Sequence, residues 1–166
     1  MRYQSTRDAT HSVGLSDAIA RGLAPDGGLY VPGRLPQLDP QAFGDPADLP
    51  ALAVRLLEPF VAGDGLAARL TDIARDAFDF PAPIVEVPGA GGDLSVLELF
   101  HGPTAAFKDF GARFLAASLE RIPREDPRRL TILVATSGDT GGAVAAAFHG
   151  RPWVDVVVLY PRGLVS

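Results

Sequence analysis

The sequence contains no cysteine, and this absence removes several kinds of chemistry at once. Without thiols the chain forms no disulfide, binds no metal through thiolate sulfur and has no cysteine nucleophile. The three histidines, His11, His101 and His149, lie far apart and lack the spacing of metal ligands, so we predict no metal site.

Long apolar runs are missing as well. No stretch approaches the roughly 20 apolar residues that a membrane-spanning helix needs, and residues 1–8 lack the apolar core of a secretory signal. Acidic residues outnumber basic ones, and the net charge of -5 argues against non-specific binding to nucleic acid. We therefore expect a cytoplasmic protein with no membrane or nucleic-acid partner. Its 47% hydrophobic and 21% charged residues suit a soluble globular chain with an adequate core.

Lysine is the scarcest charged residue, because Lys108 is the only one in the sequence. The difference from arginine matters, since arginine stays charged, whereas lysine can lose a proton and act as a nucleophile or Schiff-base amine. If the protein performs amine chemistry, Lys108 must carry it. Composition alone leaves open a second interpretation, in which an arginine bias left one lysine on a solvated helix.

The first half of the sequence alternates short helical patterns with proline and glycine. We predict helices over 12–21, 49–60 and 66–78, a turn and short strand over 24–31, and a loop with one helical turn over 32–50. The first helix is expected to begin near Ser12 or Ser16 and to end at Gly22, and Pro59 should end or kink the second. Together these elements form a small, mainly helical unit.

The pattern changes after the proline-rich segment 80–83, which we interpret as a domain boundary. The elements predicted beyond it are strands over 94–99, 130–135 and 154–160 and helices over 107–121 and 142–149. Strands that alternate with helices indicate an open parallel α/β sheet with right-handed crossovers. We predict two domains, residues 1–80 and residues 81–166. Because such a sheet would normally continue, we expect this sequence to be a fragment.

The run His101-Gly-Pro-Thr-Ala-Ala-Phe-Lys-Asp-Phe-Gly111 leads from a predicted strand into the helix that carries Lys108. Its spacing superficially resembles a phosphate-binding loop, but Phe107 replaces the second glycine and Asp109 replaces the magnesium-binding hydroxyl. A carboxylate there would repel a nucleotide phosphate, so we reject that interpretation. The flanking Phe107 and Phe110 favour partial desolvation of the amine, which lowers its pKa and promotes imine formation. A solvated helix lysine paired with Asp109 remains the alternative.

The run Thr136-Ser-Gly-Asp-Thr-Gly-Gly142 follows a predicted strand and opens a helix. Hydroxyls, glycines and backbone N–H groups at a helix N-terminus form an anion site that suits a carboxylate or a phosphate. The same pattern also fits a tight turn capped by Ser137, Asp139 or Thr140. Both interpretations remain open for this motif taken alone.

Taken together, the two runs closely resemble threonine synthases, which are pyridoxal-phosphate enzymes of the tryptophan-synthase β-like fold (fold type II). Further segments that resemble that family are Tyr3-Gln-Ser-Thr-Arg7, Gly22-Leu-Ala-Pro-Asp-Gly-Gly-Leu-Tyr30, Phe80-Pro-Ala-Pro83, Leu97-Glu-Leu-Phe100 and Tyr160-Pro-Arg-Gly163. The resemblance spans essentially the whole chain. It implies an α/β fold in which the small helical unit precedes the start of an open parallel three-layer sheet.

The family converts O-phospho-L-homoserine and water to L-threonine and phosphate. By this resemblance, Lys108 forms the internal aldimine with pyridoxal 5'-phosphate and then moves protons at the substrate α- and β-carbons, while the cofactor acts as the electron sink. The substrate-binding residues that the resemblance implies are Thr136, Ser137, Gly138, Asp139, Thr140 and Thr104. Asp139 is also implied to face the phenolic oxygen of the cofactor, which predicts a shared proton or a raised pKa for its carboxyl.

The resemblance assigns less to the neighbouring polar residues. Asp109 would orient the lysine or pair with an ion. His101 is favoured as a hydrogen-bonded structural residue, with help in positioning the lysine or substrate phosphate as the alternative. His11 and His149 are expected at the surface or at helix ends.

The family's later glycine-rich loop for the cofactor phosphate would lie beyond residue 166, and Leu164 stands where many relatives carry a basic residue. We therefore expect the fragment alone to lack turnover, and its exposed sheet edges to make it prone to self-association. Two alternatives are kept. One is another fold type II enzyme, such as a serine or threonine deaminase, and the other is a non-catalytic homologue that binds ligand without turnover.

Overall fold

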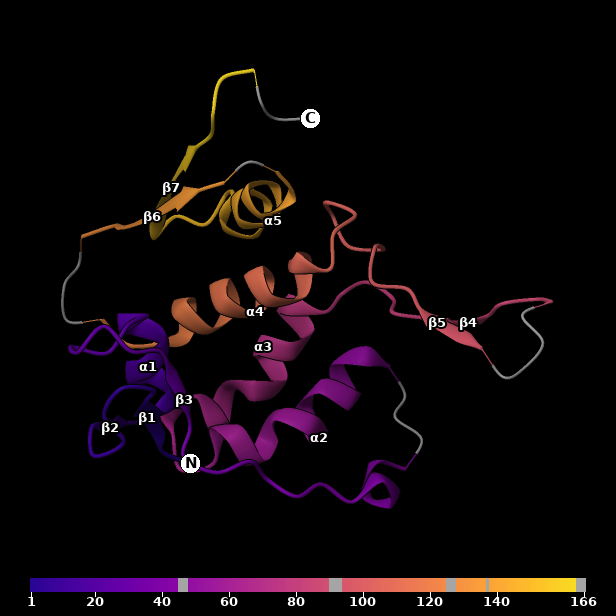
Figure 1. The fold of residues 1–166 in the computed structure, drawn as a ribbon, viewed down its shortest axis with the longest axis horizontal. Helices are drawn as coiled ribbons and strands as arrows, with labels where there is room; N and C mark the ends of the chain where they lie inside the picture. Colours follow the sequence, from indigo (N-terminus) through magenta and orange to yellow (C-terminus); the bar gives the residue numbers. More distant parts are fainter. Residues whose placement is uncertain (45–47, 90–93, 125–127, 137, 164–166) are drawn as a thin grey trace. The chain divides into compact units, whose positions relative to one another are not determined.

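The computed structural model describes residues 1–44, 48–89, 94–124, 128–136 and 138–163, which fall into two compact units (Figure 1). The first unit comprises Met1–Ala77 and Ala117–Glu125, and the second comprises Phe78–Ala116 and Asp126–Ser166. The domain boundary predicted between residues 80 and 81 remains a prediction. Among the described residues, no helix is long and apolar enough to cross a membrane.

A three-stranded antiparallel sheet in the order β2-β1-β3 opens the first unit. Its strands are β1 (Tyr3–Ser5), β2 (Ser12–Val13) and β3 (Tyr30–Pro32). The predicted short strand is confirmed as β3, which pairs with β1. The predicted helix start at Ser12 is wrong, because Ser12 pairs with Gln4 of β1 and belongs to the sheet.

The first helix, α1 (Leu15–Arg21), packs on this sheet through apolar side chains. Tyr3 and Val13 of the sheet form a buried cluster with Ala18 of α1. The helix ends at Gly22, as predicted, and the φ of 71° at Gly22 is a conformation that glycine adopts without a Cβ penalty.

The remaining helices of the first unit are η1 (Pro40–Phe43), α2 (Leu49–Val61), η2 (Gly65–Arg69) and α3 (Leu70–Ala77). The single helical turn expected within 32–50 is confirmed as η1. Pro59 does not end α2, which continues to Val61. The buried residues of α3 follow the i, i+3, i+4, i+7 spacing of one helix face and are Leu70, Ile73, Ala74 and Ala77.

Asp64 ties two of these helices together. It is the N-cap of η2, where its Oδ1 accepts a hydrogen bond of 3.0 Å from the Leu66 N–H. It also serves α1, whose own N-cap Gly14 has no side chain: the Ser16 N–H donates to Oδ2 over 3.0 Å, and the Ser16 hydroxyl donates to Oδ1. Burial raises the pKa of Asp64, but the hydrogen bonds from Ser16 and Leu66 outweigh burial and lower that pKa below its usual value.

The second unit contains an antiparallel hairpin and a parallel strand pair. Its elements are β4 (Ile84–Glu86), β5 (Ser95–Leu97), β6 (Leu130–Ala135), α5 (Asp139–Phe148) and β7 (Val154–Leu159), together with α4 (Lys108–Arg121), of which residues 108–116 belong to this unit. Strands β6 and β7 are parallel from Leu130↔Val154 to Ala135↔Leu159. Helix α5 connects them and packs against both (Figure 1).

The predicted strand over 94–99 exists in part as β5, but the partner expected for it is wrong. β5 pairs antiparallel with β4, and among the described residues only β6 and β7 form the parallel sheet. A short connection lets β4 and β5 form a hairpin, whereas a parallel pair requires a crossover such as α5.

Aromatic side chains fix the beginning of α4. Phe78 stacks on Phe114 with ring centroids 6.1 Å apart, and Phe80 meets Phe110 edge-on at 4.9 Å. Both contacts hold α4 against the chain segment at the start of the second unit.

Candidate functional site

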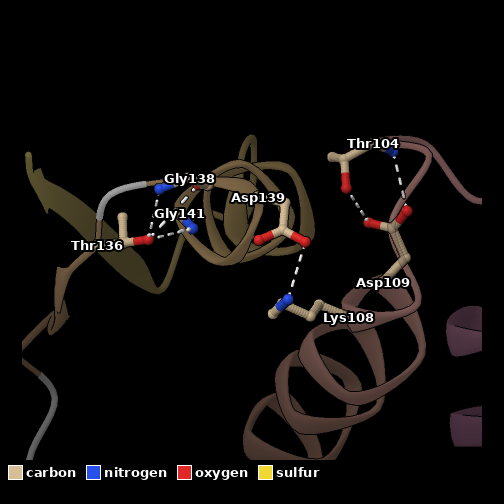
Figure 2. Close-up of polar contacts among 7 residues, drawn as sticks. All are labelled: Thr104, Lys108, Asp109, Thr136, Gly138, Asp139 and Gly141. Atoms are coloured by element: carbon tan, nitrogen blue, oxygen red, sulfur yellow. Dashed lines mark hydrogen bonds and ion pairs between the residues drawn. The ribbon is translucent and has the colours of Figure 1, made fainter. Parts of the chain in front are cut away.

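Lys108 and Asp139 meet although they come from separate sequence motifs. Lys108 is the first residue of α4 and Asp139 the first residue of α5. The Lys108 Nζ donates a hydrogen bond of 2.8 Å to Asp139 Oδ2 (Figure 2). The Lys108 side chain is 30% exposed and that of Asp139 is 57% exposed, so small molecules can reach both groups.

Of the two phenylalanines that flank Lys108, Phe107 lies against the amine. Its ring centroid is 4.4 Å from Nζ, which is a cation–π contact, and Phe107 is itself 60% exposed. Phe110 packs instead against Phe78 and Phe80. The predicted shielding from both sides is therefore wrong, because residues two apart on a helix point in different directions.

The charge of Lys108 sets the ionisation of Asp139. The hydrogen bond from Lys108 is the main cause that lowers the pKa of Asp139, and it outweighs the opposing effect of burial. The shared proton or raised pKa predicted for Asp139 opposite the phenolic oxygen of the cofactor stays a prediction. In this structure the partner is the Lys108 ammonium, which lowers the pKa.

Asp109 does not pair with Lys108, so the alternative of a Lys108–Asp109 pair is wrong. The Asp109 side chain is buried, and its carboxyl accepts hydrogen bonds from the N–H of Thr104 over 2.9 Å and from its hydroxyl over 2.7 Å. Thr104 uses its hydroxyl proton in this contact, which supports a role in shaping the turn. The predicted contact between Thr104 and substrate stays a prediction.

Thr136 organises the turn that leads into α5. Its Oγ1 accepts hydrogen bonds of 3.2 Å from the N–H groups of Gly138 and Gly141, while its own N–H donates to the Leu159 carbonyl over 2.9 Å. The N-cap position is occupied by Gly138, which has no side chain, so the predicted caps Asp139 and Thr140 are wrong. The third predicted cap, Ser137, lies outside the described residues.

A hollow of about 440 Å³ opens beside Asp139. Its lining residues are Thr136, Gly138, Asp139, Gly141, Gly142, Val158 and Tyr160. The N-terminus of α5, a hydroxyl and the absence of side chains at three glycines suit a small anion there, because the Lys108 ammonium offsets the negative charge of Asp139. Val158 and Tyr160 were missed by sequence reasoning, because only the pairing of β7 with β6 brings them to this turn.

The three histidines have structural surroundings. The His101 Nε2 lies 2.6 Å from Glu98 Oε2, and its ring stacks on Phe100. The His11 Nε2 lies 3.0 Å from the Tyr30 hydroxyl, and His149 follows the last residue of α5. The spacing of Glu98 three residues before His101 was the signal that could have revealed that pair.

Comparisons with known proteins agree on one family. The family described as "Threonine synthase N terminus" matches residues 2–78. Threonine synthase of Escherichia coli K12 is 42% identical over 168 residues, which cover 100% of this chain and 38% of that protein. The enzyme of Saccharomyces cerevisiae is 35% identical over 99% of this chain and 36% of its own length.

Solved structures give the same result. The crystal structure of threonine synthase from Escherichia coli matches with a TM-score of 0.86 at 41% identity, covering 100% of this chain and 38% of that chain. A pyridoxal-phosphate-bound threonine synthase from Brucella melitensis matches with a TM-score of 0.86 at 40% identity, covering 100% and 37%. The chain thus spans about 38% of the length of curated relatives such as the Escherichia coli enzyme.

Proposed function

We propose that this chain, which corresponds over its whole length to the N-terminal portion of threonine synthases, supplies the cofactor-bearing lysine of such an enzyme. The whole protein would convert O-phospho-L-homoserine and water to L-threonine and phosphate. The observation that carries the proposal is the accessible Nζ of Lys108, held 2.8 Å from Asp139 beside the hollow at the start of α5.

The residues of this site fit pyridoxal phosphate. The cofactor's aldehyde requires an accessible amine, and Lys108 is the only lysine in the sequence. When bound, the cofactor supplies an electron sink for carbanions next to the substrate nitrogen. The neighbour from Brucella melitensis, described as bound to pyridoxal phosphate, supports this choice of cofactor.

Each residue of the site then has a task that follows from its position. With the cofactor bound, Lys108 would exchange a proton with the substrate carbons. Before the cofactor bonds Lys108, Asp139 holds the Nζ in place and stays ionised, because the ammonium lowers the pKa of its carboxyl. Thr136 fixes the turn, so that Gly138, Thr140 and the N-terminus of α5 receive the substrate carboxylate.

Ser137 and Thr104 are proposed substrate contacts, carried by the resemblance of their motifs. The completed parallel sheet is proposed to have three layers, and the location is proposed to be cytoplasmic. Exposed Leu133 and Leu159 on the β6–β7 pair support self-association of the chain when it is produced alone.

The direct test is an absorbance scan of the full-length protein with added pyridoxal phosphate. We expect a visible band that Lys108→Ala abolishes. Lys108→Arg is the matched control, because it keeps a cation opposite Asp139 but cannot bond the aldehyde. A band that survives both substitutions would overturn the proposal.

Products separate this activity from that of a deaminase. We expect the protein to release phosphate and threonine from O-phospho-L-homoserine. Release of ammonia from threonine or serine, without phosphate release, would identify a deaminase instead. A cofactor band without either product would identify a homologue that binds ligand without turnover.

A further inference from the structure

We propose that Asp109 is a positioning residue for Lys108, acting through Thr104 to fix the turn from which α4 begins. This inference rests on the proposed function, because it concerns the amine that bonds the cofactor. In this proposal the Asp109 carboxyl acts through Thr104 and not by touching the Lys108 amine or Asp139. By fixing the turn, it determines where the backbone of Lys108 lies.

Both oxygens of the buried Asp109 carboxyl accept hydrogen bonds from one neighbour, Thr104. The Asp109 side chain is 0% exposed although Asp109 is the second residue of α4. Oδ2 accepts the Thr104 N–H over 2.9 Å, and Oδ1 accepts the Thr104 hydroxyl over 2.7 Å. Two hydrogen bonds from one residue hold Thr104 in a single orientation above the start of the helix.

The rest of the turn is built around this contact. A Cβ on Gly102 would lie 2.5 Å from Asp109 Oδ2 and 2.7 Å from Asp109 Cβ, so only glycine lets the backbone approach so closely. Ala105 has a φ of 54°, which is the left-handed region that residues with a Cβ rarely adopt. Such a conformation persists only where neighbouring contacts enforce it, and the Asp109–Thr104 bonds lie one residue away.

Three consecutive residues of α4 therefore point in three directions. Figure 2 shows Lys108 directed toward Asp139 and Asp109 directed toward Thr104. Phe110 packs against Phe80 at 4.9 Å. Asp109 and Phe110 anchor the first turn on two sides, which leaves the flexible four-carbon side chain of Lys108 with a fixed base.

The test uses a conservative pair of variants at Thr104 in the full-length protein. Thr104→Val keeps the shape but leaves Asp109 Oδ1 without its donor, whereas Thr104→Ser keeps the hydroxyl. We expect Thr104→Val to slow attachment of pyridoxal phosphate to Lys108 by about 10- to 100-fold, the effect of a displacement near 1 Å. Thr104→Ser, which keeps the hydroxyl donor to Asp109, should attach the cofactor faster than Thr104→Val. Thermal unfolding measured in parallel reports whether each variant folds.

Two controls separate positioning from general destabilisation. Ser118→Ala removes another buried hydroxyl of α4, whose Oγ has no hydrogen-bond partner among the described residues, and should leave attachment unchanged. Asp109→Leu combined with Thr104→Val should attach the cofactor no more slowly than Asp109→Leu alone, because both changes remove the same contact. The inference would be contradicted if Asp109→Leu and Thr104→Val slowed cofactor attachment additively. It would also be contradicted if Ser118→Ala slowed attachment as much as Thr104→Val does.

A second readout needs no cofactor, so it distinguishes failure of this inference from failure of the proposed function. Reductive methylation with ¹³C-formaldehyde labels Lys108, and Lys108→Arg identifies its NMR signal. We expect the signal to be shifted by the Phe107 ring and to move toward that of free lysine in Thr104→Val but not in Thr104→Ser. An unchanged signal in Thr104→Val would overturn the positioning role, whereas wild-type protein without a Lys108-dependent absorbance band would overturn the proposed function alone.

Discussion

Lys108 and Asp139 form an ion pair that matters for the position of the amine more than for the stability of the fold. Both side chains are partly exposed, and exposed ion pairs contribute little to folding stability. The pair instead keeps one accessible amine at a fixed point beside the hollow at α5. Its strength is visible in the ionisation of Asp139, whose pKa the lysine lowers.

Because the lowered pKa follows mainly from the hydrogen bond with Lys108, Lys108→Ala should raise the pKa of Asp139 toward its ordinary value of 3.8. In the wild type the ion pair is intact above this value and is lost as the pH falls through the lowered pKa. A ¹³C NMR titration of the Asp139 carboxyl measures its pKa in the wild type and in Lys108→Ala. An identical midpoint in the two proteins would show that Lys108 does not set it.

Single residues also show where sequence reasoning succeeds and where it stops. Residue type was enough to single out Lys108, because it is the only lysine in the sequence, whereas Asp139 was selected by the resemblance of its motif to threonine synthases. The sequence could not show which carboxyl faces the Lys108 amine, because positions 109 and 139 are both aspartate. The choice depends on helix geometry, which directs Asp109 toward Thr104.

Helices and strands with a local apolar pattern could be predicted from the sequence, whereas pairing between distant segments could not. The helix predicted over 107–121 is confirmed as α4, and the strands predicted over 130–135 and 154–160 are confirmed as β6 and β7. Their apolar pattern is local and therefore visible. The sheet of β1 and β2 was missed because strands of two or three residues are too short to show a period.

A matched pair of glycines tests the turn before α5. A Cβ on Gly141 would lie 2.2 Å from the Thr136 methyl, whereas a Cβ on Gly142 would meet nothing within 4 Å. Gly141→Ala should therefore displace Thr136 and lower the stability of the protein. Gly142→Ala should be neutral or stabilise it by up to about 1 kcal/mol, through higher helix propensity. Urea unfolding of both variants checks this, and equal effects would contradict the geometry of the turn.

In the first unit, a substitution of Asp64 tests how much its cap on α1 and η2 stabilises the fold. Asp64→Ala removes a cap shared by α1 and η2 and should lower the free energy of unfolding by about 1–2 kcal/mol at pH 7. The pKa of Asp64 is lowered, so this contribution is present above the ordinary value of 3.8 and is lost as the pH falls through the lowered pKa. The difference between variant and wild type should shrink in acid. Asp17→Ala, in the first turn of α1, is the control and should have a smaller effect.

The chain folds into two compact units, of which the second holds Lys108. The resemblance to threonine synthases extends through both units, from the match over residues 2–78 to the structural match over 100% of the chain. The chain spans about 38% of the length of the Escherichia coli enzyme.

The most direct measurement of the central claim is the site at which the cofactor attaches. The full-length protein is incubated with pyridoxal phosphate, reduced with borohydride, digested and examined by mass spectrometry. We predict that the added mass lies on the peptide containing Lys108 and that Lys108→Arg removes it. Cofactor mass on a different residue, with Lys108 unmodified, would contradict the assignment of this lysine.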